Sequence, residues 1–147
     1  MPRLWLTAAL PVLILSACGS EPATESQTMS PKGAAAGGGV SPAGSDRIMV
    51  NLSGEGRKPG TYGVHIHTTG QCDGPDFKSA GGHWNPFAKM HGLESDTGAH
   101  AGDLPNLVIA EGGTGALSFT VKHGTMWGEG GLMDADGAAF MIHAGPD

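Results

Sequence analysis

Histidine is concentrated in one part of this chain, and that clustering constrains the fold more than any other feature. All seven histidines lie between His65 and His143, and three of them fall within residues 68–105, a stretch with much glycine and little hydrophobic periodicity. A structureless connection of that length is uncommon in a compact domain. Metal coordination would order it, because the free energy of binding a metal contributes directly to folding. We therefore expect a long metal-binding loop.

The loop offers four metal donors at short spacing. His83, His91, His100 and Asp103 supply three imidazole nitrogens and one carboxylate from a single glycine-punctuated segment. Four nitrogen and oxygen donors are typical of tetrahedral zinc, and structural zinc sites are closed by protein ligands. The sequence therefore predicts a zinc site in this loop.

A second set of histidines belongs to predicted strands. His65 and His67 are two residues apart in residues 62–67, and the alternation of a strand puts both imidazoles on one face. A polar strand face explains that pair equally well. Together with His143, however, the pair would form a site of nitrogen donors only, and imidazole-rich sites suit copper(II). We expect this copper site to lie close to the zinc site.

Three other residues with metal-binding chemistry fall outside these sets. His123 lies between Lys122 and Gly124, and we expect it to be a surface residue. Met126 and Met133 carry thioethers that could capture additional copper. Packing is the favoured interpretation for both, because methionine commonly fills gaps in a core.

Short strands separated by glycine-rich turns account for the rest of the folded part. The expected strands are residues 48–52, 62–67, 106–110, 116–121 and 138–143. The first two flank a turn-rich connection and predict one hairpin, and the next two predict another. The chain has 26 glycines and no segment of helical periodicity, which excludes a helix bundle. We predict a single all-β domain, an antiparallel sandwich or barrel.

The charge balance argues against nucleic acid as a partner. Lys and Arg number 8 against 14 Asp and Glu, which gives a formal net charge of −6. A surface of that sign repels phosphates and anionic lipid headgroups. We expect no nucleic-acid partner.

The N-terminal residues indicate export. Residues 1–17 have a basic start at Arg3 and an apolar run too short to span a bilayer, which is typical of a signal peptide. The ending Leu15-Ser16-Ala17-Cys18 resembles a bacterial lipobox, in which the cysteine is lipidated and becomes the new N-terminus. Ordinary secretory cleavage is the alternative, although it would place Leu15 where a small residue is preferred. We expect an exported lipoprotein on the periplasmic side of a bacterial membrane, anchored through Cys18.

A flexible tether is predicted between the anchor and the domain. Residues 18–46 are rich in Gly, Ala, Ser and Pro and have few apolar side chains, so they would not offset the entropy of ordering them. The domain would then occupy residues 47–147. If Cys18 carries lipid, Cys72 is an unpaired half of a disulfide, which either pairs between chains or has its partner outside this chain.

Several segments together resemble the copper/zinc superoxide dismutase family. They are, in order, GVHIH at residues 63–67, SAGGHWNP at 79–86, HG at 91–92, HAGDLPNL at 100–107 and MIHAGPD at 141–147. The segment HIHTTGQC, which ends at Cys72, is similar to the bacterial branch. The resemblance covers residues 48–147, and as a set these motifs are very specific.

The resemblance implies a Greek-key β-barrel, two metals and a reaction. It assigns His65, His67, His83 and His143 to copper, and His83, His91, His100 and Asp103 to zinc. His83 would bridge the metals and act catalytically by taking up and returning a proton. Asp147 would accept hydrogen bonds from one histidine of each site and fix their orientation. The implied activity is the disproportionation of superoxide to dioxygen and hydrogen peroxide.

The family's pattern extends further than this chain at both ends. After the position of Asp147 the family continues with a steering loop, an arginine beside copper, the second disulfide cysteine and a final strand, and before residue 48 it has more strands. We therefore expect an incomplete sandwich, whose unpaired edges favour association, with a homodimer as one form. Three interpretations follow: an incomplete dismutase, a lipid-anchored copper- and zinc-binding protein with little turnover, or a degenerate domain that does not fold alone.

Overall fold

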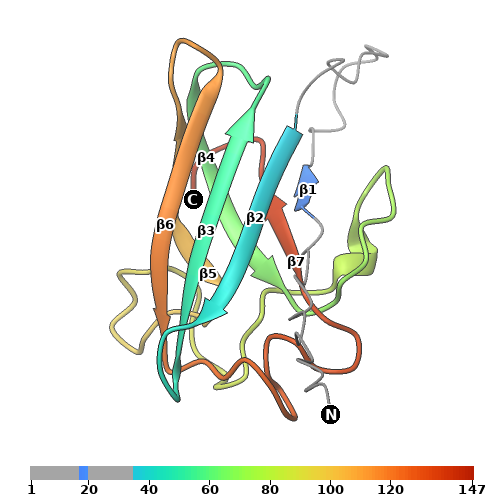
Figure 1. Cartoon of the computed structure of the whole chain (residues 1–147), viewed down its shortest axis with the longest axis vertical. Helices are drawn as coiled ribbons and strands as arrows, with labels where there is room; N and C mark the ends of the chain where they lie inside the picture. Colours follow the sequence, from blue (N-terminus) through green and yellow to red (C-terminus); the bar gives the residue numbers. More distant parts are fainter. Residues whose placement is uncertain (1–16, 20–34) are drawn as a thin grey trace, which may run out of the picture.

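The computed structural model describes residues 17–19 and 35–147, and the predicted signal peptide falls almost wholly outside them. Two β-sheets face each other (Figure 1). One sheet has the order β1 (Ala17–Gly19), β7 (Ala139–Ile142), β4 (Gly60–His67), β5 (Asp103–Ile109), and the other has the order β2 (Ala35–Pro42), β3 (Arg47–Glu55), β6 (Thr114–Lys122). All pairings are antiparallel except that of β1 with β7. The predicted all-β antiparallel sandwich is confirmed.

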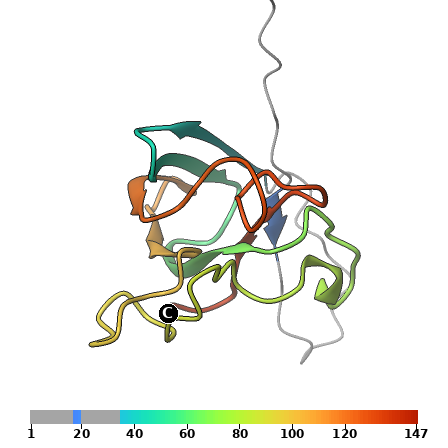
Figure 2. The ribbon, with the colours of Figure 1, turned by 90° about the horizontal axis from the view of Figure 1, so that it is seen from below.

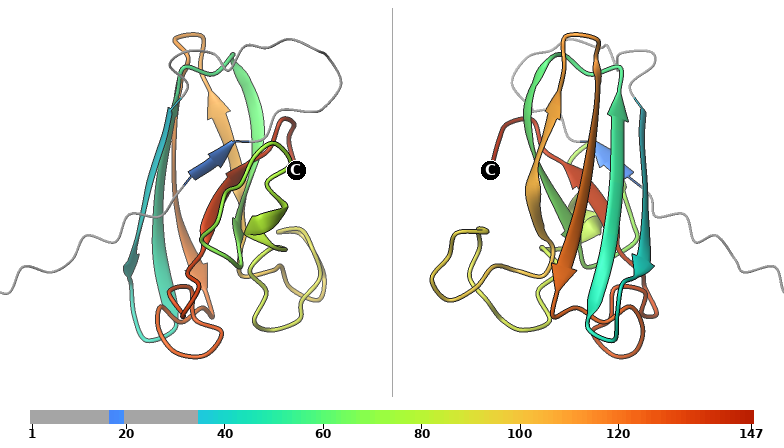
Figure 3. Two further views of the ribbon diagram at one scale, coloured as in Figure 1. Left: turned by 90° about the vertical axis from the view of Figure 1, so that its right-hand side faces the viewer. Right: turned by 60° about the vertical axis from the view of Figure 1, so that its left-hand side comes forward.

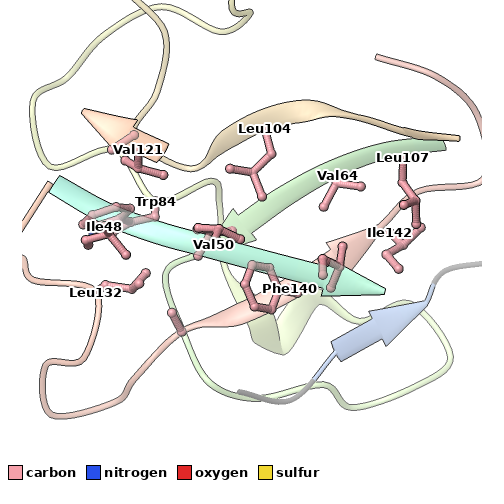
Figure 4. Close-up of a cluster of buried hydrophobic side chains, with 14 of the residues drawn as sticks. Ile48, Val50, Val64, Trp84, Leu104, Leu107, Val121, Leu132, Phe140 and Ile142 are labelled. Atoms are coloured by element: carbon pink, nitrogen blue, oxygen red, sulfur yellow. The ribbon is translucent and has the colours of Figure 1, made fainter. Parts of the chain in front are cut away.

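The core lies between the two sheets and follows from the alternation of apolar residues. In β3, buried and exposed positions alternate, so that Ile48, Val50 and Leu52 all point inward. They meet Phe140 and Ile142 of β7, together with inward side chains of β4 and β5 (Figure 4). The outer face of β7 is covered as well, because Met141 packs against the loop that contains the short 3-10 helix η1 (Lys78–Ala80).

The predicted tether of residues 18–46 is wrong for residues 35–42, because these residues form strand β2. Residues 35–42 pair along their whole length with β3, in antiparallel register from Ala35 opposite Glu55 to Pro42 opposite Ile48. Ala36 and Val40 pack against the core on the face where Gly38 lies over Leu52 and Phe140. Low side-chain volume is what lets this strand approach so closely, and the same feature made the segment look like a flexible linker.

Neither predicted hairpin forms. Strands β3 and β4 belong to different sheets, and so do β5 and β6, so both connections cross from one sheet to the other. Figure 3 shows the two layers edge-on, with β2, β3 and β6 in one and β4, β5 and β7 in the other. The reason is that consecutive strands bury their apolar faces against each other across the core instead of pairing edge to edge.

The long loop lies outside the sandwich, on the side of the sheet formed by β4, β5 and β7. Figure 2 shows the loop and the C-terminal end of the chain on the same side of the molecule. In the described part of the chain, no helix is long and apolar enough to cross a membrane.

Cys72 is disulfide-bonded in this structure, so the prediction of an unpaired cysteine is wrong. The residue lies in the loop that covers β7, packed against the small cluster of Ala80, Ala139 and Met141. The prediction assumed that Cys18 carries lipid, which would leave Cys72 as the one thiol of the folded part. The side chain of Cys18, where lipidation was predicted, lies outside the described residues.

Candidate metal centre

Strand β4 presents its two histidines on one face, as the spacing predicts. His65 and His67 are 4% and 8% exposed, and Ile66 between them points into the core. On the neighbouring strand, His143 follows the last residue of β7, and its backbone N–H donates to the carbonyl of Gly63. An isolated bridge between His67 and His83 joins the loop to the end of β4. These contacts bring four histidines from three segments together.

The four histidines form a group of nitrogen donors. One ring nitrogen from each of His65, His67, His83 and His143 lies within 4.8 Å of the others. Among the described residues, both ring nitrogens of His65 and Nε2 of both His67 and His143 are buried with no hydrogen-bond partner. A buried polar atom without a partner is costly, and metal ligation would satisfy one nitrogen of each ring. This donor set fits copper.

A hydrogen bond fixes which nitrogen of His67 is available. Nδ1 of His67 lies 2.8 Å from the carbonyl oxygen of Gly81. A carbonyl can only accept, so Nδ1 carries the proton and donates it. Nε2 therefore keeps its lone pair and faces the other histidines, which is the tautomer a metal ligand requires.

The second group of donors gathers around Asp103, at the start of β5. Its Oδ1 atom lies 3.0 Å from Nδ1 of His83, 3.2 Å from Nδ1 of His100 and 3.4 Å from Nδ1 of His91. The Nδ1 atoms of His83 and His100 are 3.4 Å apart. Zinc bonds of about 2.0–2.1 Å in a tetrahedron separate the ligand atoms by about 3.3 Å. Asp103 therefore lies at ligand spacing from all three predicted zinc histidines, but the group of four donors within 4.8 Å of one another contains His65 in place of His100.

Asp103 is held in place by its other oxygen. Oδ2 accepts hydrogen bonds from the backbone N–H groups of Gly92 and His100, at 2.8 and 3.1 Å, and the residue is 1% exposed. Burial alone would raise the pKa of Asp103, but the Gly92 hydrogen bond and the contact with His83 outweigh it, so the pKa lies below its usual value. The carboxylate is therefore ionised and aimed at the three imidazoles.

His83 belongs to both groups. Its Nδ1 faces Asp103, and its ring stacks on His65 with centroids 3.8 Å apart and meets His67 edge-on at 5.0 Å. The two groups are so close that His65 also comes within 4.8 Å of donors of His83, His91 and Asp103. One imidazole thus lies between the predicted copper and zinc donors.

Asp147 connects the two groups from outside. Its Oδ1 accepts a hydrogen bond from Nε2 of His91 at 2.8 Å and lies 3.4 Å from Nε2 of His65, too poorly aligned for a hydrogen bond. Because Nε2 of His91 donates, Nδ1 is left to face Asp103. This is the position that the sequence predicts for Asp147.

Two residues that sequence reasoning missed hold Asp147 there. Asn106 accepts the backbone N–H of Asp147 at 2.9 Å. The register between β4 and β5 shifts at Gly63, whose N–H donates to the carbonyl of Gly145 at 2.7 Å. A glycine inside a strand often marks such a bulge, and that signal could have identified Gly63 from the sequence.

The electrostatics of the histidines follow from burial and from the two carboxylates. Burial lowers the pKa of His65 from 6.5 to about 4, and His83 and His143 add to the effect. Burial lowers the pKa of His143 and His83 as well. His91 is the exception, because Asp147 and Asp103 outweigh its burial and raise its pKa. The rings of His65, His83 and His143 are therefore neutral near pH 7, as metal ligands must be.

A cavity of about 300 Å³ opens onto these side chains. Its walls include imidazoles of both groups and the segment that follows β7. The lining residues are Gly63, His65, His83, His91, His143, Gly145, Pro146 and Asp147. A small molecule from solvent can therefore reach the donor groups from this side.

The remaining candidates lie elsewhere. The side chain of His123 is 79% exposed and 3.7 Å from Asp46, as expected for a surface residue. Met126 and Met133 pack against the core, which agrees with the packing interpretation.

The sequence is similar to the sequences of known proteins. The family model described as copper/zinc superoxide dismutase matches residues 37–147. The chain is 40% identical over 106 residues to superoxide dismutase (Cu-Zn) 1 of Aquifex aeolicus, covering 68% of this chain and 61% of that protein. It is 39% identical over 106 residues to the superoxide dismutase-like protein YojM of Bacillus subtilis, covering 68% of this chain and 53% of that protein.

The structural comparison agrees with the sequence comparison. A crystal structure of a superoxide dismutase-like protein from Bacillus subtilis matches with a TM-score of 0.67 and 34% identity, covering 74% of each chain. The chain spans less than two thirds of the length of the two curated relatives above.

Proposed function

Because this chain belongs to the copper/zinc superoxide dismutase family, we propose that it disproportionates superoxide to dioxygen and hydrogen peroxide. The observation that carries the proposal is the convergence of two donor groups on one shared ring, His83, beside an open cavity. Copper would be held by His65, His67, His83 and His143, and zinc by His83, His91, His100 and Asp103. The types and spacing of the donors fit both metals.

Copper, when bound, supplies the one-electron redox chemistry of the reaction. Two superoxide ions and two protons give one dioxygen and one hydrogen peroxide. The proposed role of His83 is to move a proton. Its Nδ1 is held 3.0 Å from Asp103, so Nε2 is the atom at which the ring takes up a proton and returns it to the reduced product.

Other residues of the chain orient the proposed ligands and leave room for the substrate to enter. Asp147 fixes the ring of His91 by a 2.8 Å hydrogen bond, and the carbonyl of Gly81 fixes that of His67. Such partners set the tautomer and direction of a ligand. The cavity beside His143 and Pro146 would admit a small anion.

A second candidate function is metal binding with little turnover. The observation that favours it is the likeness to a protein named only as superoxide dismutase-like. In that case both donor groups would fill with metal and superoxide would decay at its spontaneous rate.

One experiment separates the two functions. The purified chain is loaded with copper and zinc, and metal content is measured beside the rate of superoxide removal. His83→Asn removes the shared ring, and His123→Asn is the matched control because that histidine is exposed and distant from both groups. Turnover that survives in His123→Asn and is lost in His83→Asn supports the enzyme, and full metal content without turnover supports the binding protein.

We also propose export as a lipoprotein, with lipid on Cys18. The support is the basic start, short apolar run and lipobox-like ending of residues 1–18. Mass spectrometry of the exported protein distinguishes the cases: a lipid-modified Cys18 peptide supports the proposal, and Cys18 recovered in a disulfide contradicts it.

A further inference from the structure

Three backbone hydrogen bonds close a ring at the base of the candidate metal centre. The N–H of Ile66 donates to the carbonyl of Gly102 at 2.8 Å, that of Gly102 to the carbonyl of Trp84 at 2.8 Å, and that of Trp84 to the carbonyl of Ile66 at 2.7 Å. We call these three residues the backbone clasp. They come from β4, from the segment after His83, and from the residue before β5, so the clasp joins segments far apart in sequence.

Every member of the clasp is next to proposed metal ligands. Ile66 separates His65 from His67, Trp84 follows His83, and Gly102 precedes Asp103. The clasp thus fixes the backbone of the copper-side strand, the shared histidine and the zinc-side carboxylate relative to one another. The bonds involve main-chain atoms alone, so none of them uses a side-chain atom of a proposed metal ligand.

Burial makes the clasp rigid. Ile66 is fully buried, and Trp84 is buried with its Nε1–H donating to the carbonyl of Gly130 at 3.0 Å. That bond ties the clasp to the loop before β7. Away from water, a backbone hydrogen bond has no substitute partner, so opening any one of them leaves buried polar groups unpaired.

Gly102 is required for space. A Cβ on this residue would collide with the carbonyl oxygen of Ile66 and lie 3.0 Å from the backbone nitrogen of Trp84. These are backbone atoms, which cannot turn aside as a flexible side chain can. Gly102 does not have a positive φ, so its conformation is open to other residues and the lack of a side chain is what the clasp uses.

We propose that the backbone clasp is a positioning device that sets the two donor groups at their separation before metal binds, with Gly102 and Trp84 as positioning residues. The inference deepens the proposed function and rests on it for the identity of the ligands. Donors that are already in place lose less conformational freedom on binding, so the device raises metal affinity without contacting the metal.

A matched pair of glycine substitutions tests the proposal. Gly102→Ala places a methyl group inside the clasp. Gly82→Ala is the control, because Gly82 also precedes a proposed ligand, has no positive φ, and would carry a Cβ with no atom within 4 Å. We expect zinc affinity, measured by chelator competition, to fall at least about tenfold in Gly102→Ala, the equivalent of one buried hydrogen bond, and to stay unchanged in Gly82→Ala.

Cobalt(II) provides a readout that a general loss of stability would not move. Loaded into the zinc donors, it should give the same visible absorption bands in wild type and Gly82→Ala, and shifted, weaker bands in Gly102→Ala at full loading. Identical spectra and affinities in all three proteins would overturn the proposal.

Hydrogen exchange of the metal-free wild type keeps the test decisive even if Gly102→Ala does not fold. The amides of Ile66, Trp84 and Gly102 should exchange slowly without metal, at rates like those of the core strands. Exchange at the rate of exposed loop amides would overturn the clasp. Absent superoxide turnover in the metal-loaded wild type would instead overturn the proposed function while leaving this measurement in force.

Discussion

Replacing Asp103 with asparagine perturbs the candidate zinc site while preserving the shape of the side chain. In the structure, Oδ2 accepts the N–H groups of Gly92 and His100, and Oδ1 faces the imidazole nitrogens. An amide has one oxygen, and the two N–H donors keep it facing the backbone. Its NH₂ group then faces the histidines, where it cannot bind a cation.

The size of the effect follows from the number of donors. Structural zinc sites bind with about 10–16 kcal/mol, so one of four donors contributes about 2.5–4 kcal/mol if they share equally. Since each 1.4 kcal/mol is tenfold, zinc affinity of Asp103→Asn should be about 10²–10³-fold weaker. The metal-free fold should change less, because both backbone hydrogen bonds persist.

Competition with a chromogenic chelator near neutral pH measures this loss directly. Asp76→Asn is the matched control, because that carboxylate is exposed and pairs only with Lys78, at 3.0 Å. Chemical unfolding of both metal-free variants separates affinity from stability. Wild-type zinc affinity in Asp103→Asn would refute the assignment of this carboxylate as a ligand.

Three further predictions concern orientation, pH and packing. Asp147→Asn weakens the hydrogen bond that orients His91, so metal affinity should fall about 10–100-fold in the same chelator assay, and an unchanged affinity would remove Asp147 from the site. The unfolded chain protonates His65 below pH 6.5 and the folded chain only near pH 4, so the metal-free protein should lose stability as pH falls across that window. Urea unfolding at about pH 7 and about pH 5 should show a decrease of about 2 kcal/mol, and equal stabilities would contradict it. Gly38→Val should destabilise the fold by about 1–3 kcal/mol, because its Cβ would lie 2.9 Å from Leu52 and 3.0 Å from Phe140, whereas Gly39→Val meets nothing within 4 Å; equal thermal stabilities of the two variants would argue against β2 as a core strand.

Much of the site could be predicted because local periodicity fixes it. His65 and His67 share a face in any strand, and the short spacings among His91, His100 and Asp103 let one loop deliver all of them to one point. The connection between the two groups through Asp147 depends instead on hydrogen bonds made by Gly63 and Asn106. A glycine inside a strand hints at the first, but no residue pattern predicts the second.

The errors have a common physical origin in tertiary contacts. Strand β2 carries Gly37, Gly38 and Gly39, whose intrinsic preference opposes a strand, and only the close packing of Gly38 on Leu52 and Phe140 explains their use. The hairpins failed for a similar reason, because turn residues indicate where the chain reverses but not whether it returns to the same sheet.

Superoxide removal by the chain loaded with copper and zinc tests the central claim most directly. We predict uptake of one copper and one zinc per chain, and a catalytic rate that disappears when copper is removed and when His83 is replaced by asparagine. A chain that binds both metals tightly and leaves superoxide decay at its spontaneous rate would contradict the proposed enzyme.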